Sequence, residues 1–146
     1  MGKSTASITI SSADIADNSF SVSNTATLTK AGSATGFNKM TGLTRITTTA
    51  TANVILINSG DTAGNFGAAA AGGDVITKGK FFIQNLNART EDGDKFVNIL
   101  QGALVIGRLY GGDWAFFPSN GASGDDIEIT PSSTTETICE YVMIYE

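Results

Sequence analysis

The sequence predicts an all-β fold, an antiparallel β-sandwich of the jelly-roll type, with an extended N-terminal arm. Three observations lead to this prediction. Apolar residues alternate with serine and threonine along much of the chain, which is typical of strands with one solvated face. Threonine is β-branched and disfavours helix interiors. Turn signals, many of them glycines, recur at the spacing expected of a sandwich, jelly roll or small barrel.

A chain of 146 residues falls within the usual size of a single domain. We expect residues 1–18 to form a flexible or strand-adding arm and residues 19–146 to form a single β-sandwich domain. The arm alternates around Ile8 and Ile10, which are candidate interface residues. It is otherwise polar, so a frayed terminus explains the same pattern.

In the first half, strands are expected at 6–12, 20–29, 43–51 and 53–58. The apolar run Val54–Ile57 should lie in the core. Residues 60–74 are rich in glycine and alanine and are unusually long for a structureless connection in a compact domain. They form either a mobile surface loop or a segment ordered against a neighbouring subunit, with Phe66 as the candidate contact.

The second half contains six short strand candidates separated by turn signals: 80–86, 95–100, 103–110, 113–117, 125–130 and 137–145. The pair Gly111–Gly112 predicts a hairpin, because two glycines tolerate the positive φ angles of a primed turn.

Two aromatic groups are candidates for binding. A strand places Trp114 and Phe116 on one face and Phe117 on the other. These residues either fill the core or anchor an interface, where enclosed aromatic residues concentrate binding energy. The last strand is apolar on both faces, which indicates a central position or cover from another subunit. We therefore add Trp114, Phe117, Tyr141 and Tyr145 to the candidate interface.

The composition argues against catalysis. The chain has no histidine, the commonest general base at neutral pH and a common metal ligand. Its one cysteine, Cys139, can form no intrachain disulfide and is expected to be a buried thiol. A catalytic cysteine would lack its usual histidine partner. We expect no enzymatic activity, no cofactor and no metal site.

Local motifs do not change this expectation. Gly2–Thr5 imitates the end of a phosphate-binding loop but lacks the preceding glycine and strand. Glu91–Asp94 resembles a calcium loop, yet Val97 occupies the position that needs glycine. The carboxylates left for acid–base chemistry all lie in or beside turns, where such groups are hydrated or bonded to the backbone. They are Asp113, Asp125, Asp126 and Glu128.

Charge and hydropathy limit the partners. The net charge of −5 opposes binding to nucleic acid, whose affinity for proteins comes mainly from clustered lysine and arginine. No segment has the length and apolar character of a signal peptide or a membrane span. We expect a protein made in the cytoplasm that binds neither nucleic acid nor a membrane and forms homo-oligomers.

Four segments of the second half follow one order of strands and turns: Lys80–Asn85, Phe96–Ile99, Gly112–Pro118 and Glu140–Glu146. In this order the chain resembles small β-structured virion proteins of tailed bacteriophages. In those proteins a strand ending in asparagine precedes a short apolar strand, a Gly-Asp or Gly-Glu turn leads into an aromatic strand, and the terminal strand contains Glu-Tyr. No functional residue carries over, and the threonine-rich first half has no counterpart.

The resemblance implies a head-decoration or cement protein, often trimeric, on the exterior of the virion head. Such a protein clamps neighbouring shell subunits, so its partner is the major capsid protein or another virion protein. The alternative is a receptor- or glycan-binding module of a tail fibre or adhesin. In that case Trp114 or Tyr110 would stack on sugar rings.

Overall fold

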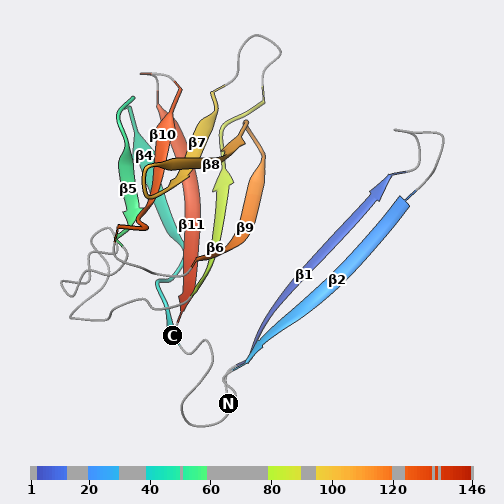
Figure 1. The fold of residues 1–146 in the computed structure, drawn as a ribbon. Helices are drawn as coiled ribbons and strands as arrows, with labels where there is room; N and C mark the ends of the chain where they lie inside the picture. The colour runs from blue at the N-terminus through green and yellow to red at the C-terminus, as the bar shows by residue number, and fades with distance from the viewer. Residues whose placement is uncertain are drawn as a thin grey trace. The chain divides into compact units, whose positions relative to one another are not determined.

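The computed structural model describes residues 3–12, 20–29, 39–49, 51–58, 79–89, 95–119, 124–132, 134 and 136–145. These residues form eleven strands and no helix (Figure 1). The chain divides into two compact units, residues 1–38 and 39–146, which we describe separately.

The first unit is a two-stranded antiparallel ribbon. Strand β1 (Lys3–Ser12) pairs along its whole length with β2 (Phe20–Thr29). Hydroxyl groups face each other across the strands, as for Ser7 and Thr25, whose oxygens lie 3.1 Å apart. Both strands repeat the same alternation of hydroxyl-bearing residues, which favours this cross-strand pairing. The division predicted after residue 18 therefore differs from the observed one, because β2 pairs with β1 instead of joining the sandwich.

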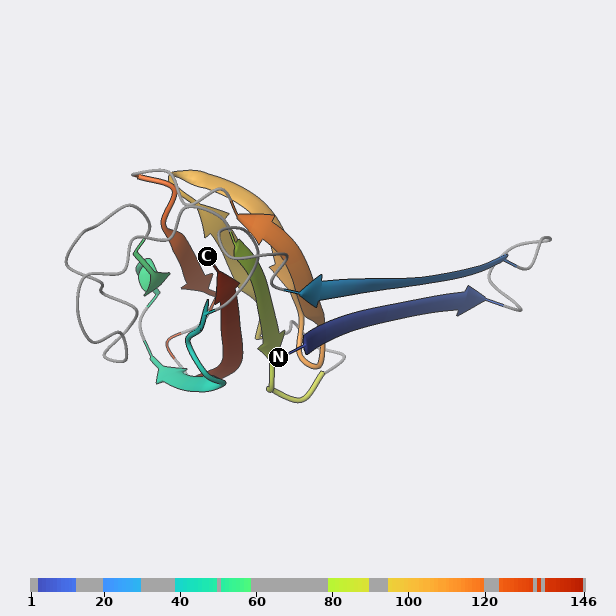
Figure 2. The ribbon, with the colours of Figure 1, turned by 90° about the horizontal axis from the view of Figure 1, so that it is seen from below.

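The second unit is a sandwich of two antiparallel sheets (Figure 2). The first sheet, here called the β11 sheet, has the order β3–β11–β6–β9. Strands β3 and β4 pair with different parts of β11, β3 near its end and β4 near its start. The strands of this sheet are β3 (Lys39–Met40), β4 (Thr44–Thr48), β6 (Gly79–Asn85), β9 (Trp114–Ser119) and β11 (Thr137–Tyr145).

The second sheet, here called the β7 sheet, has the order β5–β10–β7–β8. Its strands are β5 (Val54–Ile57), β7 (Val97–Gln101), β8 (Leu104–Leu109) and β10 (Ile127–Pro131). All pairings in both sheets are antiparallel.

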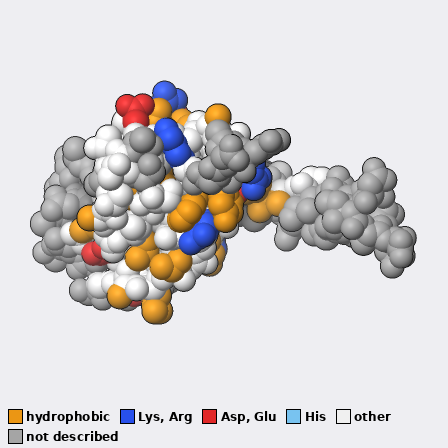
Figure 3. All heavy atoms as spheres, turned by 90° about the horizontal axis from the view of Figure 1, so that it is seen from above, with side chains coloured by type: hydrophobic (Ala, Val, Ile, Leu, Met, Phe, Trp, Pro, Cys, Tyr) orange, Lys and Arg blue, Asp and Glu red, His pale blue; other side chains and the backbone are white. Residues whose placement is uncertain are grey.

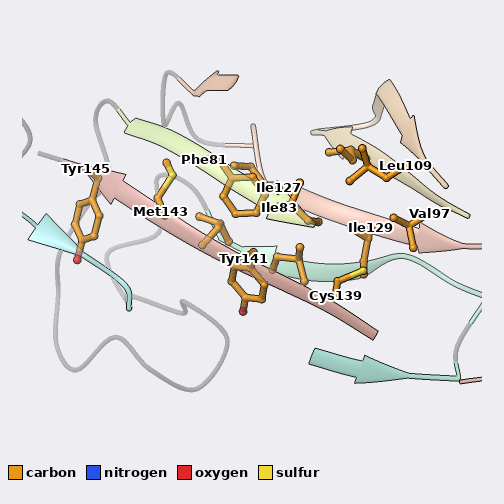
Figure 4. Packing of buried hydrophobic residues seen from close by; sticks show 13 residues of the cluster. Phe81, Ile83, Val97, Leu109, Ile127, Ile129, Cys139, Tyr141, Met143 and Tyr145 are labelled. Atoms are coloured by element: carbon orange, nitrogen blue, oxygen red, sulfur yellow. The ribbon is translucent and has the colours of Figure 1, made fainter. Parts of the chain in front are cut away.

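The core fills the space between the two sheets (Figure 4). Odd-numbered residues of β6 and β11 point inward, and the ring centroids of Phe81 and Tyr141 lie 5.8 Å apart. The β7 sheet contributes Ile99, Ile127 and Ile129. These observations confirm the predicted all-β antiparallel sandwich.

Strand β5 departs from the prediction at one residue. Ile57 pairs with Ile127, but the next partner, Glu128, pairs with Ile55, so Leu56 is an extra residue in the ladder. This bulge leaves Leu56 and Ile57 both fully buried. Ile55 instead has 48% of its surface exposed, so placing the whole run in the core was wrong for this residue.

Most connections cross between the sheets. The chain changes sheet between β4 and β5, at each of the next two connections, and at every connection from β8 to β11. Within the described part of this unit, β7 and β8 are the consecutive strands that pair as a hairpin. Gly111 and Gly112 do form a turn, and Gly112 has a φ of +83°. The predicted hairpin was wrong, however, because β8 pairs with β7 and β9 pairs with β6.

A fully buried residue, Asn85, contacts this turn and the strands beside it. Its Nδ2 donates to the carbonyl oxygens of Lys95 (3.0 Å) and Leu109 (3.1 Å). Its Oδ1 accepts from the backbone N–H (3.1 Å) and the Nδ2 (2.7 Å) of Asn87. The backbone carbonyl of Asn85 accepts a hydrogen bond from the backbone N–H of Gly112. One side chain at the end of β6, in the β11 sheet, therefore bonds to the end of β8, in the β7 sheet.

We expect Asn85→Asp to destabilise the fold strongly. The side chain keeps its shape, but an oxygen replaces the Nδ2 donor, so two buried carbonyls lose their partner and face a carboxyl group. Each buried group left unsatisfied costs about 1–3 kcal/mol. The free energy of unfolding, measured with urea, should fall by roughly 3 kcal/mol or more.

Asn98→Asp is the matched control for this substitution. The Asn98 oxygen accepts a hydrogen bond from Arg108 Nε (3.0 Å), a role that a carboxylate also fills. We expect a change within about 0.5 kcal/mol at this site. Equal losses in the two variants would contradict the role assigned to Asn85.

Because of the bulge in β5, we expect substitutions of two isoleucines in this strand to reduce stability by different amounts. Ile57→Thr buries a hydroxyl and removes packing, so the free energy of unfolding should fall by roughly 2–3 kcal/mol. Ile55→Thr changes an exposed side chain and should cost less than about 1 kcal/mol. Thermal or urea unfolding measures both, and a larger loss at Ile55 would show that the strand faces the other way.

Candidate interaction surfaces

Two of the four carboxylates considered for catalysis, Asp113 and Glu128, make structural contacts. Asp113 Oδ2 accepts from the backbone N–H of Tyr110 (3.0 Å), and its Oδ1 lies 3.6 Å from Arg89 Nη1. Glu128 Oε2 accepts from Asn53 Nδ2 (2.6 Å). Asp113 therefore caps its turn, as its position in the sequence predicted. Among the described residues, no three His, Cys, Asp or Glu side chains gather in a group that could hold a metal ion.

Cys139 is a buried thiol, as predicted. Burial raises its pKa from the ordinary value of 9.0 to about 12, because the core cannot solvate a thiolate. Burial also raises the pKa of the neighbouring core residue Tyr141. Both groups stay neutral at physiological pH and act as packing residues.

Three predicted interface residues belong to the core instead. Tyr141 and Tyr145 are buried on the inner face of β11, and Phe117 packs against Phe81 with ring centroids 5.4 Å apart. The interface prediction was wrong for them because odd-numbered residues of β9 and β11 face the β7 sheet. The alternative interpretation, core packing, holds for Phe117.

The predicted contacts outside the sandwich remain predictions. Ile8 is half-buried within the ribbon. Ile10 lies in β1 opposite Val22, but its side chain is outside the described part of the structure. Phe66 and the glycine-rich segment around it are also outside the described residues.

Trp114 is exposed, with 49% of its surface accessible, on the outer side of the β11 sheet. Its ring stacks on Phe82 with centroids 6.3 Å apart. Phe82 is paired in register with Val142 on one side and Phe116 on the other. Together with their apolar neighbours, these residues form a patch that we call the outer apolar face. It consists of Met40, Phe82, Trp114, Phe116, Val142 and Ile144.

A second apolar surface lies at the start of β8, and sequence reasoning missed it. Three consecutive residues are exposed: Leu104 at 72%, Val105 at 61% and Ile106 at 47%. We call them the edge surface. Figure 3 shows that apolar side chains do reach the surface of this unit in groups. The signal available in the sequence was three apolar residues in a row directly after the Gly102–Ala103 turn.

Strand β8 is an edge of its sheet, and among the described strands only β7 pairs with it. The other edges carry protective features. Strand β9 contains Pro118, which has no N–H to offer, and the β3–β4 edge is interrupted at Gly42. Strand β5 has only four residues. A bulge at Ile106 twists β8, but three of its four exposed residues are apolar, the fourth being Arg108, so this edge can accept another strand.

The one charged residue of β8 is already engaged. The Arg108 guanidinium lies 3.8 Å from the centroid of the Phe96 ring, and its Nε donates to Asn98. Phe96 in turn packs edge-on against Tyr110, with ring centroids 5.8 Å apart. The edge surface therefore presents apolar groups and backbone hydrogen-bonding groups.

Comparisons with protein families, curated proteins and solved structures give no match for this chain. In the described part of the chain there is no helix of the length and hydropathy needed to cross a membrane.

The buried thiol predicts how stability depends on pH. Between pH 9 and pH 12 the unfolded chain releases the Cys139 proton, whereas the folded chain keeps it. The stabilisation present below pH 9 is therefore lost as the pH rises, with a slope of about −1.4 kcal/mol per pH unit.

Cys139→Ala should remove this contribution. Urea unfolding at several alkaline pH values should then give curves that converge for the two proteins, because all other titrating groups are shared. Parallel curves would show that the thiol ionises equally in both states.

Proposed function

We propose that this protein is a structural virion protein, a decoration or cement protein that binds the outer surface of a capsid and stabilises the shell. The class of partner comes from the resemblance to small virion proteins of tailed bacteriophages. The mode of binding comes from the edge surface, which is the observation that carries the proposal.

The strand order supports this class of protein. Counting β3 and β4 as one edge, the sandwich has two sheets of four positions, and successive strands mostly alternate between the sheets. This order supports the interpretation of the sandwich as a jelly roll, a fold found in viral capsid and lectin domains. Fold alone does not assign function, so the contact surface carries the rest of the argument.

The edge surface fits an extended segment of a shell protein. A strand added to β8 would bond to backbone groups that no described strand pairs with, and Leu104, Val105 and Ile106 would contact alternate side chains of that strand. The surface beside Gly107 is open as well, since a Cβ placed there would meet nothing within 4 Å. A ligand that prefers the assembled shell stabilises it by mass action, so this function needs contacts and no catalysis.

Binding is measured to capsid shells that were assembled without this protein. Each edge of the β7 sheet has one exposed isoleucine, so one is substituted as the test and the other as the control. Ile106 on β8 and Ile55 on β5 are 47% and 48% exposed. Ile106→Lys places a charge on the edge, a device that natural edge strands use against pairing. The affinity for shells should fall at least about tenfold, equivalent to about 1.4 kcal/mol.

Ile55→Lys is the control and should bind shells like the unmodified protein, because its lysine lies opposite Glu128 away from β8. Equal binding by all three proteins would reject β8 as the contact. Absence of binding by the unmodified protein would reject the cement function.

One observation favours a second function. The half-exposed Trp114 ring is a platform on which a sugar could stack, as in the alternative of a receptor- or glycan-binding module. Quantitative mass spectrometry of fractionated virions separates the two. A cement protein should be abundant on purified heads, whereas a receptor-binding module should be scarce and associated with tails.

A further inference from the structure

The outer apolar face lies on the opposite sheet from the edge surface and has a composition of its own. Its centre is the cross-strand row Val142–Phe82–Phe116, with Trp114 stacked beside it. Phe82, Phe116 and Val142 are half-buried against one another before any partner binds. The face is therefore preformed and needs little ordering to make a contact.

The charges on this face nearly cancel. Arg45 on β4 pairs with Glu140 on β11, and both lie on the outer side of the sheet. Lys80, between Ile144 and Pro118 in the register, is the other charge that the described strands of this sheet place on its outer side. The chain as a whole has a net charge of −5. Two copies carry the same net negative charge, so they can approach at a lower electrostatic cost through this nearly neutral face.

The apolar centre also favours a second copy over an unrelated partner. Interfaces between identical subunits are more apolar than those of transient complexes, and their centres are enriched in aromatic residues and depleted in charge. A row of two phenylalanines and a valine next to a tryptophan has this composition.

We propose that the outer apolar face is the contact between copies of this chain, with Trp114 and Phe116 enclosed at its centre. This contact is independent of whatever binds the edge surface.

The chain provides its own probe, because Trp114 is the single tryptophan. In the full-length protein, its fluorescence should shift to shorter wavelength and become resistant to acrylamide quenching as the concentration rises. Sedimentation velocity over the same concentrations should show a species larger than a monomer. A monomer at all concentrations with a quenchable Trp114 would overturn the proposal.

Substitutions then locate the contact. Phe116→Glu places a charge at the centre of the face and should raise the dissociation constant for self-association at least about tenfold. Trp114→Lys, which changes a more exposed side chain, should do the same if Phe116→Glu fails to fold. Ile106→Lys, on the edge surface, should leave self-association unchanged. An oligomer that resists both Phe116→Glu and Trp114→Lys would overturn the proposal.

One further outcome identifies a different occupant. If purified bacterial cell-surface polysaccharide protects Trp114 from acrylamide while the protein sediments as a monomer, the face binds glycans and the self-association proposal fails. Loss of shell binding in Ile106→Lys with normal sedimentation bears on the cement function alone, so the two proposals can fail separately.

Discussion

The hydrogen bonds of the buried Asn85 amide fix one end of the sandwich, and the position of both surfaces depends on that end. Apolar packing between the sheets is non-directional and tolerates small shifts of one sheet over the other. The Asn85 amide allows no such shift, because it must satisfy the carbonyls of Lys95 and Leu109 at once. Leu109 ends β8, and Asp113, whose carbonyl accepts from the Asn85 N–H, immediately precedes Trp114. The side chain of Asn85 therefore holds the end of β8, the strand of the edge surface, and its backbone N–H holds the residue that precedes β9.

For strand β11, the sequence alone does not show which face is buried in the core. Its two sets of alternating residues are both apolar, so periodicity alone indicates two buried or contacted faces without saying which is inward. Tyr141 and Tyr145 were assigned to the interface and lie in the core instead. Val142 and Ile144, from the other set, contribute to the outer apolar face. The large rings fill the gap between sheets, which is about 10 Å wide in packed β-sheets.

The sequence allowed prediction of those features that depend on local pattern. Period-two alternation and turn residues predicted the fold class, most strands and the buried thiol of Cys139. The Gly111–Gly112 turn was also correct, since positive φ is a local requirement. Which partners the two strands beside this turn pair with was not predictable locally, because pairing is set by the whole sheet. The edge surface was missed in the sequence for the same reason. Leu104–Ile106 has the sequence of a core strand, and only the sheet order shows that β8 is an edge.

The placement of the two surfaces on different sheets has a consequence for binding strength. A single edge surface provides the backbone hydrogen bonds of one strand and three apolar side chains, so we expect the contact that it makes to be weak. An oligomer formed through the outer apolar face would present several edge surfaces held at fixed distances. Once one of them binds a shell subunit, the others meet neighbouring subunits at high effective concentration, and avidity can exceed the single affinity by about 10²–10⁴. A regular lattice supplies sites at matching spacing, so weak contacts on one sheet and self-association on the other would together select an assembled shell over free subunits.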